Sequence, residues 1–236
     1  MESETAKNAV LERLESIRQK LRTACESAGR DPQAVTLMAV TKTVDPELIN
    51  TAVDAGVHVL GENRVQEFLG KRELYRADAE VQFIGHLQTN KVKQIIDKVS
   101  MIQSVDSLHL AEAIDRAAEH AGLRMPVLLE VNIGGELSKS GVSPAELPAL
   151  LRDVQQLPCI EVRGLMTIPP PAADPAEQDA VFAEMAALYR EMQNEAPLSV
   201  LSMGMSGDYE SAARHGSTMV RIGSALFGAR YYPPKL

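Results

Sequence analysis

The sequence predicts an α/β protein that folds as a single (β/α)8 barrel of the TIM type, preceded by one extra helix. Short apolar segments, partly β-branched, alternate with segments of helical periodicity between residues 34 and 223. Such alternation is typical of a parallel sheet, and eight apolar segments are enough to close a barrel. No linker rich in Gly, Ser or Pro divides the chain, so we expect residues 1–236 to form one domain.

The first element is an amphipathic helix expected over residues 4–29. Its apolar residues recur at helical spacing among charged ones: Val10, Leu14, Ile17 and Leu21. Gly29 follows them as a stop signal. Because the first strand comes only later, we expect the segment 1–30 to pack on the barrel as an additional element.

Strands and helices then alternate. The predicted strands span residues 34–40, 57–60, 81–85, 101–105, 125–133, 160–168, 200–204 and 219–223. The predicted helices span residues 45–56, 62–76, 90–98, 107–121, 143–156, 175–194 and 207–215. Asp45 is expected to cap the first of these helices, and Ser143 with Glu146 predicts a capping box at residue 143. No clear helix follows the last strand. The glycine-rich turn of a doubly wound sheet is missing after the first strand, which argues against an open sheet.

The composition narrows the classes of function. The net charge of −8 and the pI near 5.2 argue against a nucleic-acid or anionic-membrane surface but allow a local pocket for a small phosphate. Cys25 and Cys159 lie far apart in no metal-ligand spacing, so we expect a reduced, intracellular protein without a metal site. The polar N-terminus is no signal peptide, and no apolar run reaches the roughly 20 residues that span a bilayer. We therefore expect a cytoplasmic protein.

Polar residues at strand ends are the candidates for chemistry, because barrel active sites lie at the C-terminal ends of the strands. Lys42 follows the first strand, and its amine is either a nucleophile in the barrel mouth or an ordinary surface group. Asn63 either binds a ligand or caps the next helix, and His86 stands in a dense polar run that favours a site. Arg221 lies inside the last strand, where a guanidinium is costly unless it contacts a ligand or pairs, for example with Glu130.

A phosphate site is predicted at the last two strand ends. Ser206 follows the seventh strand, and Gly223 and Ser224 follow the eighth. Phosphate sites in barrels commonly use these two loops together with a short helix N-terminus. The alternative is that Ser206 and Asp208 only cap the next helix, but the presence of two such loops favours phosphate.

Several spaced motifs resemble one known family. They are AVTKT (39–43), GENRVQE (61–67), FIGHLQTNK (83–91), SKSG (138–141), RGLMTI (163–168), LSMGMSGDYESAA (201–213) and STMVRIGSALFGAR (217–230). On these motifs the chain resembles the pyridoxal phosphate homeostasis proteins, which are related to the barrel half of bacterial alanine racemase. The resemblance runs from about Val35 to Tyr231. Gln82 departs from it, because many members have His before FIG.

The resemblance implies that pyridoxal 5′-phosphate (PLP) is the bound cofactor. The resemblance implies a Schiff base between PLP and Lys42. It also implies that the phosphate is held by Ser206, Gly223, Ser224 and the backbone of Met205, and that the ring is lined by Asn63, His86 and Arg221. Arg221 would face the pyridine nitrogen. Because arginine stays protonated, that nitrogen would stay unprotonated and the ring would be a weak electron sink.

Racemisation needs an acid or a base on each face of the substrate carbon. In the racemases one of these is a tyrosine of a second subunit, whose C-terminal β domain completes the site. This chain ends at Leu236, and Tyr209 is its only aromatic hydroxyl near a site loop. We therefore expect no catalytic residue and no robust enzyme activity.

The expected function is PLP binding in vitamin B6 and amino-acid homeostasis. The protein would be a monomer that exchanges PLP with PLP-dependent apoenzymes and binds neither nucleic acid nor membrane. Two alternatives stay open: a PLP-dependent amino-acid racemase of weak activity, and a phosphate-sugar barrel enzyme that never binds PLP.

Overall fold

The computed structural model describes residues 2–136 and 140–228 and shows a closed barrel of parallel strands in the order β1 to β8. The strands are β1 (Thr36–Val40), β2 (Val59–Glu62), β3 (Glu80–Phe83), β4 (Met101–Val105), β5 (Met125–Val131), β6 (Ile160–Thr167), β7 (Val200–Met205) and β8 (Met219–Ile222). β1 pairs with both β2 and β8, which closes the sheet. The predicted fold class is therefore confirmed.

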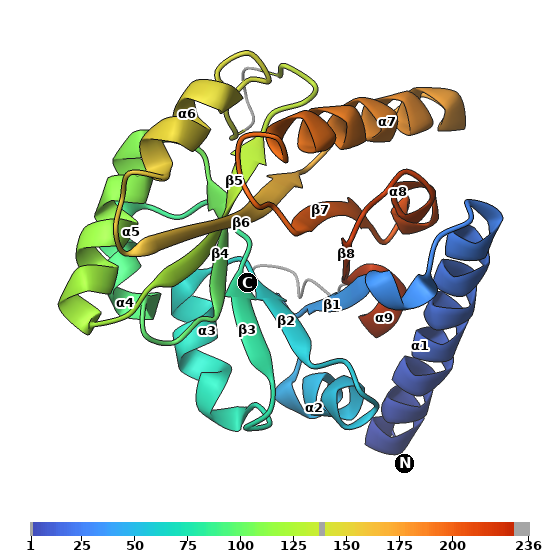
Figure 1. Ribbon diagram of the computed structural model, residues 1–236. Helices are drawn as coiled ribbons and strands as arrows, with labels where there is room; N and C mark the ends of the chain where they lie inside the picture. The colour runs from blue at the N-terminus through green and yellow to red at the C-terminus, as the bar shows by residue number, and fades with distance from the viewer. Residues whose placement is uncertain (1, 137–139, 229–236) are drawn as a thin grey trace.

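Helices surround the barrel on its outside (Figure 1). They are α1 (Glu2–Ser27), α2 (Pro46–Asp54), α3 (Val65–Lys71), α4 (Val92–Ile95), α5 (Leu108–Ala121), α6 (Leu147–Val154), α7 (Pro175–Met192), α8 (Tyr209–Arg214) and α9 (Ser224–Phe227). Short 3-10 turns lie between these elements: η1 (Pro32–Ala34), η2 (Arg72–Leu74) and η3 (Thr89–Lys91). None of the helices in the described part of the chain has both the length and the apolar character needed to cross a membrane.

The N-terminal helix packs on the barrel as predicted. The apolar stripe of α1 is buried at Val10, Leu14, Ile17 and Leu21. It contacts α2, α8 and α9 (Figure 1). Burying a stripe of this kind against neighbouring helices stabilises a long helix far more than its intrinsic propensity does.

Most element boundaries differ from the prediction by one to five residues, and the start of α6 is one of the larger differences. α6 begins at Leu147 instead of residue 143. The side chains of Ser143 and Glu146 do bond to each other, but they lie in the turn before the helix. Pro148 explains the delay, because it has no N–H to donate to the carbonyl of residue 144.

Two further differences lie at the end of β2 and after β8. Residues 61 and 62 extend β2 beyond its predicted end at residue 60 and pair with Gln82 and Phe83 of β3. α9, which follows β8, was not predicted because four residues are too few to show a periodicity. Parts of two sequence motifs lie outside the described residues, namely Ser138, Lys139, Ala229 and Arg230. Tyr231 lies outside them as well.

The barrel interior contains both apolar and polar side chains. Met38, Ile84 and Met219 form an apolar cluster inside it, with Val40 and Val59 packed against them. Buried polar side chains from β3, β4, β7 and β8 are hydrogen-bonded to one another inside the barrel, namely Gln82, Gln103, Ser202 and Arg221. The barrel therefore has a packed interior, and the space for a ligand is found at the ends of its strands.

Candidate functional site

A cavity of about 320 Å³ lies at the C-terminal ends of β1, β2, β3, β6, β7 and β8. It brings together most of the residues predicted from the sequence: Lys42, Asn63, Met205, Ser206, Arg221, Gly223 and Ser224. Apolar side chains, among them Val40 and Ile168, complete its wall. This mixture of apolar walls and a few converging polar groups is typical of small-molecule sites.

His86 does not line this cavity. Its side chain is 63% exposed, with Nδ1 3.7 Å from a carboxylate oxygen of Asp106 and 3.5 Å from the hydroxyl of Ser140. It lies in the loop after β3 and belongs to the rim. The structure thus separates His86 from the other predicted residues.

The alternation of the first strand aims Lys42 at the cavity. Met38 and Val40 belong to the interior apolar cluster. Lys42 comes two residues later, and residues two apart along an extended chain share a face. Lys42 is half-buried and lines the cavity, at the strand end where the sequence predicted a nucleophile.

The loops after β2 and β3 meet closely at Asn63. A Cβ atom at Gly85 would lie 2.1 Å from the carbonyl oxygen of Asn63, so a residue with a side chain does not fit there without movement. The side-chain oxygen of Asn63 is buried and has no hydrogen-bond partner among the described residues. Asn63 lines the cavity, but this oxygen is enclosed.

The hydroxyl of Ser206 caps α9. Its oxygen accepts the N–H of Gly223 at 3.1 Å and that of Ala225 at 3.2 Å. The predicted alternative, in which Ser206 and Asp208 cap the helix after β7, is wrong: the Asp208 carboxylate accepts instead from the Met205 N–H at 2.5 Å, and α8 has no side-chain cap. Two backbone donors at the N-terminus of α9 thus point at the cavity wall, and such donors suit an anion.

Arg221 places a buried cation in the cavity. One guanidinium nitrogen donates to the Ser202 hydroxyl at 2.8 Å and the other to the Thr167 carbonyl at 2.7 Å. Burial lowers the pKa of Arg221 to about 10, although Asp208 and Glu130 act to raise it, so the side chain stays charged at neutral pH. The ion pair with Glu130 considered from the sequence is wrong, because no carboxylate in the described ranges lies within pairing distance of Arg221.

A hydrogen-bonded chain inside the barrel supports Arg221. Ser202 donates to Gln103 at 2.7 Å, and the amide nitrogen of Gln103 donates to Gln82 at 2.6 Å. Sequence reasoning missed these residues. The signal was present, because polar side chains at inward positions of buried strands need partners.

A second group of missed residues lies behind Lys42. Glu62 at the end of β2 is fully buried and faces Glu67 and Lys71 of α3. Glu62 and Glu67 are both in the motif GENRVQE. A buried glutamate between an apolar strand and a helix indicates a charged partner, and the sequence does not show that Lys71 supplies it.

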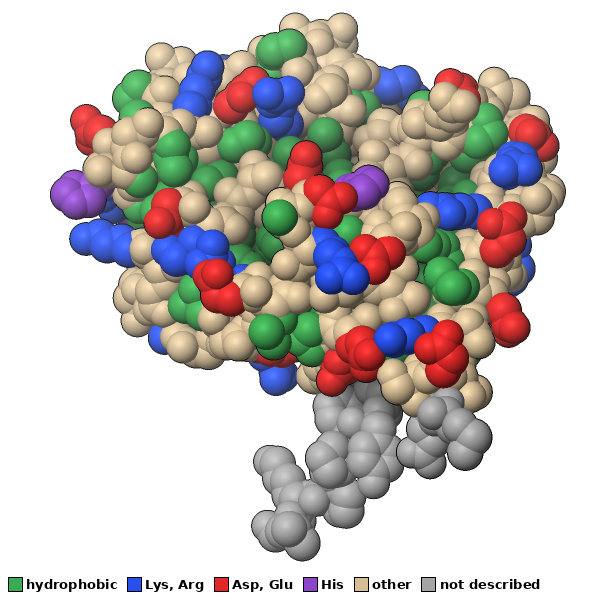
Figure 2. Space-filling model, turned by 90° about the horizontal axis from the view of Figure 1, so that it is seen from below, with side chains coloured by type: hydrophobic (Ala, Val, Ile, Leu, Met, Phe, Trp, Pro, Cys, Tyr) green, Lys and Arg blue, Asp and Glu red, His purple; other side chains and the backbone are tan. Residues whose placement is uncertain are grey.

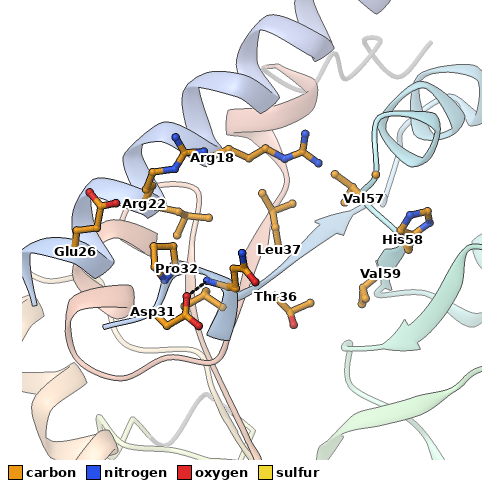
Figure 3. A pocket seen from close by; sticks show the side chains of 14 residues that line it. Arg18, Arg22, Glu26, Asp31, Pro32, Thr36, Leu37, Val57, His58 and Val59 are labelled. Atoms are coloured by element: carbon orange, nitrogen blue, oxygen red, sulfur yellow. Dashed lines mark hydrogen bonds between the residues drawn. The ribbon is translucent and has the colours of Figure 1, made fainter. Parts of the chain in front are cut away.

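A larger cavity of about 580 Å³ lies at the opposite end of the barrel, between α1 and the starts of β1 and β2. Figure 3 shows Arg18, Arg22 and Glu26 on α1, with Asp31 and His58 across from them. Charges of both signs line it, and the N-terminal ends of barrel strands usually serve stability. Figure 2 likewise shows acidic and basic side chains interspersed over the face seen from below. We therefore place the candidate site at the C-terminal strand ends.

Comparisons with known proteins identify the family of this chain. The family model described as alanine racemase, N-terminal domain, matches residues 13–231. A pyridoxal phosphate homeostasis protein of Aquifex aeolicus is 45% identical over 224 residues, which cover 94% of this chain and 98% of that protein. The chain belongs to the pyridoxal phosphate homeostasis protein family. The resemblance noted from the motifs is confirmed.

Solved structures of similar proteins share the fold. An unknown protein from Bifidobacterium adolescentis matches with a TM-score of 0.90 and 35% identity, over 94% of this chain and 96% of that one. PipY of Synechococcus elongatus, solved with PLP bound, matches with a TM-score of 0.80 and 37% identity, over 93% of this chain and all of PipY (100%). Proteins that share 35–37% identity with this chain thus have the same fold.

Proposed function

We propose that this protein binds PLP as a Schiff base on Lys42 and serves in PLP homeostasis without robust catalysis. One observation carries the proposal: a single cavity joins Lys42 with the buried Arg221 and with the loops that hold Ser206 and Gly223. Membership of the family supports it, and so does PipY, whose structure contains PLP.

The residues of the cavity fit the groups of PLP. Its volume of about 320 Å³ falls at the lower end of the roughly 300–1,000 Å³ that is common for small-molecule sites. PLP brings an aldehyde that condenses with an amine, a phosphate dianion and a pyridine nitrogen that accepts a hydrogen bond. The cavity offers a lysine amine, backbone donors at the start of α9 and a guanidinium.

Each residue then has a defined task. Lys42 supplies the amine, and the apolar side chains of Val40 and Ile168 line the cavity with it. The N–H groups of Gly223 and Ala225, now bonded to Ser206, would donate to the phosphate. Arg221 holds its proton, and a donor of this kind keeps the ring nitrogen unprotonated. We further propose one domain that acts as a monomer in the cytoplasm and passes PLP to apoenzymes.

The first prediction tests the covalent link. Addition of PLP to the wild-type protein should produce a Schiff-base absorbance band, and borohydride reduction followed by peptide mapping should find the label on Lys42. The variant Lys42→Ala should lose the band, whereas Lys93→Ala, which removes an exposed lysine of α4, should keep it. Absence of the band in the wild type, or a label on another lysine, would refute the proposal.

The enzymatic alternative is an amino-acid racemase of weak activity. Tyr209, the aromatic hydroxyl singled out from the sequence, is 5% exposed and does not line the cavity, so it does not supply the second face. Incubation of the PLP-loaded protein with L- and D-amino acids in D₂O decides between the two functions. Exchange at the α-carbon at rates of about 1 s⁻¹ or more, the range of ordinary enzymes, would end the carrier proposal.

A further inference from the structure

A cluster of charged side chains connects α3 to the end of β1, behind the cavity. The ammonium group of Lys71 lies 3.2 Å from Glu62 and 2.8 Å from Glu67, and it donates to the backbone carbonyl of Thr41 at 2.7 Å. Glu62 also accepts from the Thr41 hydroxyl at 2.7 Å and from the Tyr75 hydroxyl. We call Glu62, Glu67 and Lys71 the α3 clamp.

The clamp holds both chain neighbours of Lys42. Thr41 is fully buried and bonds to the clamp through its carbonyl and its hydroxyl. Thr43 has a φ of +60°, the sole positive φ that a non-glycine residue shows in the ranges described. Its N–H donates to the carboxylate of Glu67. A β-branched residue leaves this left-handed region unless its surroundings hold it there.

We propose that Glu67, held in place by Lys71, is a positioning residue that directs the amine of Lys42 into the cavity. This inference rests on the proposed attachment of PLP to Lys42. Without the bond from Thr43 to Glu67, the chain after Lys42 would relax out of its strained conformation, and the lysine side chain would turn with it. A misplacement of about 1 Å can reduce reactivity roughly a hundredfold.

The charge of Glu67 suits this role. Burial acts to raise its pKa, but the hydrogen bonds from Lys71 and from the Thr43 N–H outweigh burial and leave the pKa below its ordinary value. Glu67 is therefore ionised at neutral pH, and hydrogen bonds to an ionised acceptor are about twice as strong as neutral ones. The alternative is that the clamp only fastens α3 to the barrel. In that case the loss of the clamp would lower the stability of the protein and would lower the affinity for every ligand by the same factor.

The test compares two ligands that differ at one group. PLP has an aldehyde that reacts with Lys42, and pyridoxine 5′-phosphate has an alcohol that does not. In Glu67→Leu we expect the affinity for PLP to fall about tenfold or more, with the affinity for pyridoxine 5′-phosphate within about twofold of wild type. Glu67→Gln should recover part of the loss, because its amide oxygen still accepts from Thr43. Glu73→Gln, which removes an exposed carboxylate of η2, is the matched control.

A second variant covers the case in which Glu67→Leu does not fold. Thr43 is exposed, so Thr43→Pro leaves the buried cluster intact while it removes the N–H and forbids the positive φ. It should show the same selective loss of PLP affinity. Equal losses for both ligands, or no loss in the folded variants, would overturn the positioning role. The proposed function fails as well if the wild type binds both ligands equally and shows no Schiff-base band. The band in the wild type therefore distinguishes failure of the positioning role from failure of the proposed function.

Discussion

At the scale of single residues, Arg221 imposes a direction on the polar interior of the barrel. A guanidinium has donors only, so the Ser202 hydroxyl that accepts from it must give its own proton to Gln103. The oxygen of Gln103 faces Ser202 for that reason, and its nitrogen faces Gln82 and the sulfur of Met219. The charge of Arg221 therefore fixes the orientation of the side-chain amides of Gln103 and Gln82. These hydrogen bonds in turn hold the guanidinium group in place.

Replacing Gln103 tests this chain. Gln103→Leu leaves the buried Ser202 hydroxyl without its acceptor, which should cost about 1–3 kcal/mol of the free energy of unfolding. Because Arg221 loses a fixed partner, the affinity for PLP should fall several-fold. Urea denaturation and PLP titration measure the two effects. Gln156→Leu at an exposed position should stay within about 0.5 kcal/mol of wild type. A Gln103→Leu protein with unchanged stability and affinity would show that the chain does not orient Arg221.

At the scale of elements, the sequence predicts a boundary correctly where the residues that stabilise it are close to it in the sequence. The predicted strand 101–105 matches β4, and Asp45 caps α2 as expected by accepting the Glu47 N–H at 2.8 Å. The end of β2 was missed because Glu62 is polar, and polar residues rarely occur inside a buried strand. The reason it occurs here is Lys71, which comes from the next helix and which no periodicity reveals.

The cap of α2 gives the prediction at this scale. Asp45→Ala removes the side chain that satisfies the free N–H of Glu47 and should cost about 1 kcal/mol, a decrease in Tm of roughly 2–4 °C for a chain of this size. Asp45→Asn should cost almost nothing, because asparagine caps as well as aspartate. Thermal unfolding followed by circular dichroism measures both variants. Equal losses for Asn and Ala would mean that the charge of Asp45, and not its capping bond, is what stabilises α2.

At the scale of the whole molecule, closure of the barrel decides which distant residues meet. Strand ends are visible in the sequence, so the sequence alone places Lys42, Ser206 and Arg221 at one end of the barrel. It does not give their orientation within that end, and His86 lies on the rim although its strand, β3, ends at the same end of the barrel. The partners of Arg221 come from β6 and β7, and only the register of the closed sheet brings them within reach.

The same closure buries Glu130 of β5, which is 6% exposed. Burial raises its pKa from about 4.5 to about 7; Asp106 adds to this effect and Arg221 opposes it. Between these two pH values the folded protein holds a proton that the unfolded chain has released. Stability contributed by the neutral carboxyl is therefore present at pH 4 and is lost as the pH rises toward 7.

We accordingly expect Glu130→Gln, which cannot ionise, to be more stable than wild type at pH 8 and to lose less stability between pH 5 and pH 8. The shift in pKa corresponds to about 3 kcal/mol over the full interval. Urea unfolding at both pH values measures the difference, with Glu184→Gln on the exposed face of α7 as the matched loss of a carboxylate. Parallel pH profiles for wild type and Glu130→Gln would mean that Glu130 ionises as readily in the fold as in water, and that Arg221 stabilises its charge at a distance after all.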